Sequence, residues 1–177
     1  MNSQNKIVRL ISTTQSRSKE WAIYAASIWA FTFAAMSFYW AAGGTLGVDT
    51  LGNGIKEMAL AREPGFVMIL WITAALKFLL GLLALVLLRR WGRSITRWML
   101  CVSSIGVGLG MVLYGGAGLI KVGLMKAGIV SIPSAIGSDA VHWYLMLWEP
   151  FWLAGGILFL IAVWQFNRGH NHRLLMR

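Results

Sequence analysis

The sequence predicts an all-α integral membrane protein, a bundle of four spanning helices that forms a single transmembrane domain over residues 1–177. Three observations predict it. Hydrophobic residues make up 58% of the chain and charged residues only 12%, whereas about a quarter of residues are charged in typical soluble proteins. The hydrophobic residues fall in four blocks, each long enough to cross a bilayer. A chain of 177 residues leaves no room for a separate soluble domain beside such a bundle.

The four blocks set the expected spans and the loops between them. The expected spans are 21–42, 66–88, 98–120 and 142–166. Aromatic residues flank the first span at both ends, as they do at membrane–water interfaces, and Gly43-Gly44 then terminates the helix. The two long loops are 43–65 and 121–141. Apolar residues at helical spacing predict a short interfacial helix over Ile55–Arg62, and the apolar stretch 121–137 is expected to lie in the interface or to dip into the bundle.

The distribution of basic residues predicts the orientation of the bundle. The N-terminal segment, the turn at 89–97 and the C-terminal tail hold eleven of the 16 Lys and Arg residues. The two long loops hold four, and Lys77 lies inside the second span. Positive charge concentrates on cytoplasmic loops, so we expect both termini in the cytoplasm and both long loops outside. We expect the bacterial cytoplasmic membrane as the location, with the lipid bilayer as the surrounding partner.

Composition also bears on partners and cofactors. The net charge of +10 lies in short runs at the ends of apolar blocks, which is the pattern of a topology signal and not of a nucleic-acid surface. The single cysteine, Cys101, cannot form an internal disulfide. His170 and His172 lack a third ligand nearby, so no metal site and no cofactor is expected.

Glycines predict how the helices pack. Small residues four apart let helices approach closely, and the third span holds the pairs Gly106 with Gly110 and Ser104 with Gly108. The glycines expected at helix contacts, in one bundle or between copies of the chain, are Gly106, Gly110, Gly115, Gly155 and Gly156. A weak internal echo favours two similar helical hairpins: Glu63-Pro64 opens the second span and Glu149-Pro150 enters the fourth. Chance in a chain rich in glycine and aromatic residues is the alternative.

A candidate polar pocket lies toward the outer half of the bundle. Glu149 and Lys77 are expected about 25 Å and about 16 Å from the inner ends of their spans, so a lysine reaching outward could meet the acid. Opposite charges inside an apolar bundle are expected to pair because an unpaired one costs more. His142 lies seven residues before Glu149, two turns along one helix face. The full candidate set is Glu149, Lys77, His142, Tyr39, Trp40 and Trp148.

Pro150 leaves two readings of the last helix open. In one, the helix is continuous and bends at the proline, and Glu149 is a buried, paired carboxylate with a functional or a purely structural role. In the other, Pro150 is the first residue of a shorter helix ending near Phe166, and Glu149 is an interfacial charge at the helix entrance.

Two short motifs carry a family resemblance. Tyr39-Trp40-Ala41-Ala42-Gly43-Gly44 closes the first span, and Trp148-Glu149-Pro150, followed by Gly155-Gly156, enters the last. With these motifs the chain resembles a bacterial family of small four-span membrane proteins, the domain of unknown function 3995 family. The histidine that usually precedes the first tryptophan of that family is replaced here by Ser37 or Phe38. The resemblance implies the four-span fold and implies no activity.

Three classes of function fit these features. The first is a non-enzymatic accessory, sensing or partner-binding bundle with an outward-facing polar and aromatic pocket, and the absence of catalytic motifs favours it. The second is a membrane enzyme on a lipid-soluble substrate, with Glu149 and His142 as acid and base. The third is a small oligomeric transporter using Glu149 and Lys77 as a relay. The expected partners are a lipid or small apolar ligand, another membrane protein, or further copies of the chain.

Overall fold

The described part of the chain is all-α: it consists of helices and the turns that join them, without a strand. The structure is a computed structural model that describes residues 20–89 and 94–174, with side chains up to Arg168. Within these residues four helices are long and apolar enough to cross a membrane: Trp21–Ala41, Pro64–Val86, Ile95–Lys126 and Ser138–Arg168. The predicted fold class is therefore confirmed, and the chain is a multi-pass membrane protein. The basic N-terminal segment lies outside the described residues, and so do residues 90–93 of the predicted cytoplasmic turn, which include Arg90 and Arg93.

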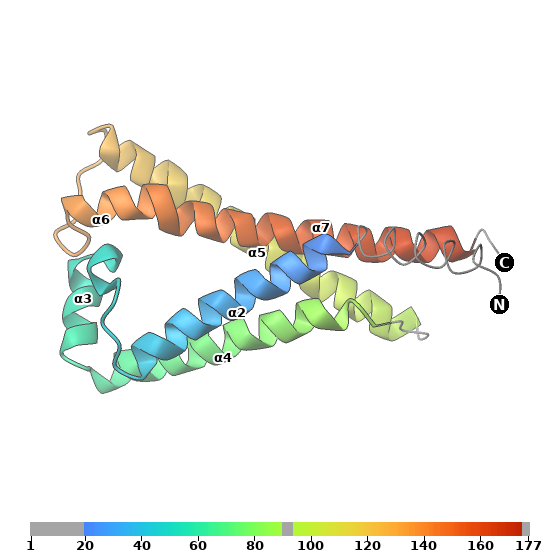
Figure 1. The fold of residues 1–177 in the computed structure, drawn as a ribbon. Coiled ribbons are helices and arrows are strands. Elements are labelled where there is room, and N and C mark those ends of the chain that lie inside the picture. Colours follow the sequence, from blue (N-terminus) through green and yellow to red (C-terminus); the bar gives the residue numbers. More distant parts are fainter. Residues whose placement is uncertain (1–19, 90–93, 175–177) are drawn as a thin grey trace, which may run out of the picture.

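The four long helices form two hairpins. Helix α2 (Trp21–Ala41) packs along α4 (Pro64–Val86), and α5 (Ser94–Lys126) packs along α7 (Glu149–Leu174). The hairpins meet mainly where α2 contacts α7, whereas α4 and α5 touch at few positions. They spread apart toward the end that carries α3 and α6, and the start of α2 and the end of α7 lie at the opposite end (Figure 1).

Short helices connect the long ones at the end where the hairpins spread apart, which we call the wide end. The first connection holds η1 (Val48–Leu51) and α3 (Asn53–Leu60), which confirms the predicted short helix in this loop. The second long helix begins at Pro64, two residues before the expected position, as suits a proline in a first helical turn. Helix α5 runs six residues beyond its expected end at Ile120, because Val122 and Met125 continue its buried stripe against Val141. This continuation explains the apolar residues at the start of the expected loop 121–141.

The last helix passes through Pro150 without a break. Helix α6 (Ser138–Trp143), the π-helical segment η2 (Tyr144–Trp148) and α7 follow one another directly. Proline has no N–H to give the helix, and a π-turn beside it is one of the local adjustments that accommodate the missing bond. The continuous helix is therefore the correct reading, and a helix that starts at Pro150 is not.

Close packing of α5 on α7 depends on one stripe of small and apolar residues. Its buried members are three or four residues apart, except for one step of seven from Gly115 to Val122: Ser104, Gly108, Met111, Gly115, Val122 and Met125. A Cβ on Gly156 would stand 2.7 Å from the Gly108 carbonyl oxygen, so the two backbones are in contact there. Gly106 and Gly110, in contrast, face open space, and no described residue packs against an added Cβ at either of them. Of the two predicted small-residue pairs, the structure uses Ser104 with Gly108.

An aromatic core fills the region between the hairpins. The Trp29 ring stacks on Phe151 at 5.1 Å between centroids, and its indole N–H donates to the Phe151 carbonyl oxygen at 3.0 Å. Trp29 also lies over Gly155, where a side chain would collide with the indole. Gly155, one of the glycines expected at helix contacts, therefore lets α7 pack closely against α2. The rest of this core consists of Phe33, Trp40, Trp148 and Trp152 with their aliphatic neighbours.

Candidate functional site

Glu149 is buried at the seam between α5 and α7. Its side chain is only 5% exposed, and Oε2 is fully buried without a hydrogen-bond partner. The carboxyl group fills the space left by the missing side chain of Gly118, because a Cβ there would overlap it. Gly115, one turn earlier on α5, lets the backbone at Glu149 come equally close. Buried polar atoms in folded proteins nearly always have a hydrogen-bond partner, so this unpaired oxygen is an exception.

The groups around this carboxyl are polar but do not bond to it. Lys121, three residues beyond Gly118 on α5, and the hydroxyls of Tyr114 and Tyr144 act on Glu149 electrostatically. None of them is within hydrogen-bond or ion-pair distance of it. The Tyr144 hydroxyl instead donates to the Leu51 carbonyl oxygen at 3.0 Å. The carboxyl therefore lies in a polar corner whose donors are committed elsewhere or held too far away.

Lys77 lies where α2, α4 and α7 meet. Its Nζ donates a hydrogen bond to the Ser37 hydroxyl at 2.7 Å, and Ser37 is 1% exposed. The same nitrogen lies 3.6 Å from the centroid of the Phe33 ring and 5.9 Å from that of Trp152. An ammonium over an aromatic face is attracted by the ring electrons, and this attraction replaces part of the hydration that the charge has lost. No carboxylate takes part.

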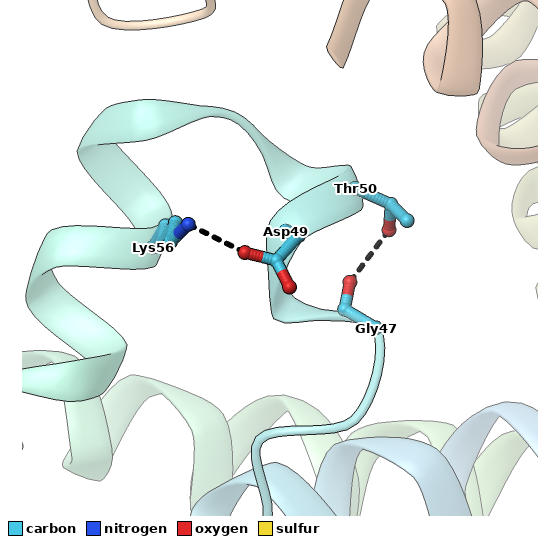
Figure 2. A network of polar contacts seen from close by, with 4 residues as sticks. All are labelled: Gly47, Asp49, Thr50 and Lys56. Carbon is cyan, nitrogen blue, oxygen red and sulfur yellow. Dashed lines mark hydrogen bonds and ion pairs between the residues drawn. The ribbon is translucent and has the colours of Figure 1, made fainter. Parts of the chain in front are cut away.

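The predicted pair between Lys77 and Glu149 does not form. Within the described residues the only ion pair joins Lys56 Nζ to Asp49 Oδ1 at 2.5 Å, in the connection between α2 and α4 (Figure 2). The Trp152 ring lies beside Lys77. It also contacts the ring of Tyr114, a residue of α5, at 5.1 Å between centroids. The prediction compared depths along the helices only. Glu149 points toward α5 and Lys77 toward α2, so similar depth does not bring them together.

Trp40 and Trp148 do come together, beneath the connecting segments. Their ring centroids are 5.8 Å apart, and both are buried. The Trp148 indole donates to the Thr50 hydroxyl at 3.1 Å, and the Trp40 indole donates to the Leu46 carbonyl oxygen at 2.8 Å. Tyr39, in contrast, is 47% exposed, and its hydroxyl accepts a hydrogen bond from the Leu46 N–H. The two tryptophans thus fasten the first connection to the aromatic core, and Tyr39 holds its outer side.

His142 does not join Glu149. It is exposed on α6, with its ring against neighbouring Trp143. Two residues seven apart share a face only on a regular α-helix, and the π-helical segment Tyr144–Trp148 lies between these two. Because hydrogen bonds in that segment step by five residues, the expected two-turn register is lost. The predicted acid–base arrangement of His142 with Glu149 is therefore absent from this structure.

The two connections form a joint cap over the wide end. The Gly54 N–H donates to the Ala135 carbonyl oxygen at 2.9 Å, and the Asn53 amide donates to the Ser134 carbonyl oxygen at 3.0 Å. Figure 2 shows how the first connection is tied internally, with the Thr50 hydroxyl donating to the Gly47 carbonyl oxygen at 2.6 Å. The connecting segments of the two hairpins thus form one structural unit above the aromatic core.

The turn that ends α2 gives a structural role to the first sequence motif. The Gly43 N–H donates to the Trp40 carbonyl oxygen at 3.0 Å and the Gly44 N–H to that of Tyr39 at 2.8 Å, with Gly43 at φ 107°. This pattern is a Schellman C-cap, which needs a left-handed residue. Gly44 has no room for a side chain because the Tyr39 ring covers it. The guanidinium of Arg62 also satisfies the C-terminus of α2 by donating to the Ala41 carbonyl oxygen at 3.0 Å.

These motifs belong to the region that matches a known family. The family described as "Protein of unknown function (DUF3995)" matches residues 30–159, which is most of the chain. The chain belongs to this family. The matched region contains the glycine turn that ends α2, as well as Lys77 and Glu149. No curated protein and no solved structure matches the chain.

Sequence reasoning missed several residues of this DUF3995 protein that surround the two charges. Ser37 and Phe33 contact Lys77, and Gly118 makes room for Glu149. Phe33 and Ser37 are four residues apart on α2, so helical spacing places them on one face. Gly118 continues the spacing of the α5 stripe. Both signals were present in the sequence, but neither indicates which helix the face would meet.

Proposed function

We propose that this DUF3995 protein is a non-enzymatic binding bundle of the membrane that senses a lipid-soluble molecule at its aromatic core. The observation that carries the proposal is that Lys77 and Glu149 each reach the neighbourhood of this core and form no ion pair with any described residue. Lys121 acts on Glu149 only from beyond ion-pair distance. The Trp152 ring lies 5.9 Å from Lys77 Nζ and also contacts Tyr114 of α5, whose hydroxyl interacts electrostatically with Glu149.

Free-energy costs support this proposal. A lysine within a spanning helix costs about 2.5–3.5 kcal/mol on insertion scales, and a buried polar group without a partner costs about 1–3 kcal/mol. An ion pair between the two side chains would offset much of this cost, and the fold does not make one. Charged groups that a membrane protein keeps in its spans without an internal ion pair are candidates for binding something from outside the chain.

Other functions receive less support from the geometry. Acid–base catalysis by Glu149 and His142 needs the two groups to converge, and His142 is exposed on α6. A relay between Lys77 and Glu149 needs polar groups in a continuous series, whereas the contacts of Lys77 are the Ser37 hydroxyl and the aromatic rings of Phe33 and Trp152. A binding role asks only that each charge meet a ligand group.

The expected orientation becomes part of the proposal. We place the protein in the bacterial cytoplasmic membrane with both termini in the cytoplasm and the cap outside, because eleven of the 16 basic residues flank the opposite ends of the spans. Alkaline phosphatase, which is active only outside the cytoplasm, should be active when inserted at Gly128 and inactive when fused after Arg177. The reverse pattern would overturn this orientation.

Retention of a small molecule by the purified protein tests the binding role. The protein is extracted in a mild detergent, and the compounds it releases are identified by mass spectrometry. We expect an amphipathic compound with the wild type that is depleted in Lys77→Met or Glu149→Gln. Lys126→Met and Glu57→Gln serve as matched controls, because Lys126 is exposed and Glu57 lies in the cap. The proposed function is rejected if the wild type retains no compound. It is also rejected if all four variants retain the same compounds as the wild type in equal amounts.

A further inference from the structure

We infer that Lys77 holds the anionic head of a membrane amphiphile, a carboxylate or phosphate on an apolar chain, at the junction of α2, α4 and α7. This inference rests on the proposed function and names the ligand class of one of its two charges. Three features carry it: the unused donors of the ammonium, its access to the bilayer and its depth.

The ammonium has donors to spare. A lysine carries three N–H donors and no acceptor. One donor is used by the Ser37 hydroxyl, and the aromatic face of Phe33 covers one side of the group at 3.6 Å. Within the described chain no carboxylate reaches it. An anionic oxygen from a ligand would complete both the charge and the hydrogen bonding, and such charge-assisted bonds are about twice as strong as neutral ones.

The site is open toward the bilayer on one side. Lys77 is partly exposed, although Ser37 and the rings around it belong to the packed interior. Its helix is the least buried of the four spans: 17% of the α4 span lies inside the protein, against 50% for α2. Among the described helices, α4 packs mainly on α2 and touches α5 at few positions, so α5 does not cover it. An amphiphile can therefore approach Lys77 sideways from the membrane.

The depth of the ammonium suits a head group. Ser37, which fixes the nitrogen, lies four residues before the end of α2, or about 6 Å along the helix axis. The Lys77 side chain thus reaches toward the capped end of the bundle and away from the membrane centre, as snorkelling lysines do. A charged head at this level would lie just inside the helix ends, with its apolar chain along α4 toward the other end.

A compact ammonium binds carboxylate and phosphate as a point charge and does not require the flat, two-pronged geometry that arginine recognises. The inferred class therefore includes both anions, which can be separated with probes that share one chain. Oleate supplies the carboxylate, 1-oleoyl lysophosphatidate the phosphate, oleyl alcohol a neutral head and oleylamine a cationic head.

Saturable binding of these four probes to the purified protein in dodecyl maltoside provides the test. We expect oleate, lysophosphatidate or both to bind, and oleyl alcohol to bind at least about tenfold more weakly. Lys77→Met should weaken the anionic probes by about tenfold or more, Lys77→Arg should retain most of the binding, and Lys126→Met should change nothing. Ser37→Ala should weaken binding a few-fold, because the hydroxyl positions the nitrogen. Binding of only one anion assigns the head as carboxylate or phosphate.

Each contrary result has a distinct meaning. Equal binding of the anionic probes by the wild type and by folded Lys77→Met would overturn the inference. If Lys77→Met does not fold, equal affinity for oleate and oleyl alcohol in the wild type has the same consequence. Binding of oleylamine alone, lost in Glu149→Gln, would overturn this inference while leaving the proposed function in place at the other charge. If no probe binds saturably and no retained compound is found, both are rejected.

Discussion

Replacing Gly156 by alanine tests whether backbone contact holds α5 and α7 together. The new Cβ would stand 2.7 Å from the Gly108 carbonyl oxygen and 2.8 Å from the Val112 nitrogen. Both atoms belong to the α5 backbone and cannot rotate away, so the two helices must separate. The matched control is Gly106→Ala on α5, where no atom lies within 4 Å of the added carbon.

The magnitude follows from two terms. Inserting a methyl group into a well-packed contact costs about 1–3 kcal/mol. Replacing glycine by alanine inside a helix contributes about 1 kcal/mol in the favourable direction, and this term applies to both variants. The unfolding free energy of Gly156→Ala should therefore lie about 1–3 kcal/mol below that of Gly106→Ala, which should equal or exceed the wild type.

Equilibrium unfolding in mixed micelles of dodecyl maltoside and sodium dodecyl sulfate, followed by circular dichroism, measures both values. Equal unfolding free energies for the two variants would refute the close contact at Gly156. A less stable Gly106→Ala would instead mean that the open face of α5 packs against another chain, and that this glycine has a role between copies of the protein.

Three more substitutions are measured with the same unfolding assay. Trp148→Phe removes the indole donor to Thr50 and should cost about 1 kcal/mol, with no change if the cap does not depend on this bond. Arg62→Met should cost about 0.5–1 kcal/mol, because its guanidinium bonds to the carbonyl oxygen of Ala41 at the α2 terminus, while Arg62→Lys should recover part of the loss. Glu149→Met should raise stability by about 1 kcal/mol or more by removing a buried carboxyl without a partner, and a loss would show that the acid is satisfied in the bilayer.

Much of the fold could be predicted from the sequence, because the membrane sets simple requirements. Blocks of apolar residues long enough to span, with aromatic residues at their ends, identify helices whatever their neighbours are. The glycine pair after Trp40 likewise predicts the end of α2, since the left-handed turn there is a local property of the backbone. The end of α5 was placed too early, because a buried stripe that continues past a lysine looks the same as an apolar loop.

The candidate site was predicted only in part. Trp40 and Trp148 were both assigned to the candidate pocket, and their rings lie side by side, whereas Tyr39 and His142 lie outside the core. Lys77 was expected to need a partner, and the structure supplies a serine hydroxyl and an aromatic face in place of the acid. Serine and phenylalanine are ordinary residues of a spanning helix, so nothing marked them as partners of a charge before the helices were packed.

The sequence by itself determined the class of this protein: four apolar spans, glycine turns at the cap end, and two charged residues placed where charges are costly. Only the tertiary structure decided which faces of the helices meet. Spans that are apolar on every side carry no polar stripe to show which face is inward, so the rotation of each helix follows from packing alone. One π-turn before Pro150 then changes the register of the whole upper part of the last helix. For these two reasons Glu149 lies against Gly118, and Lys77 lies against Phe33 and Ser37.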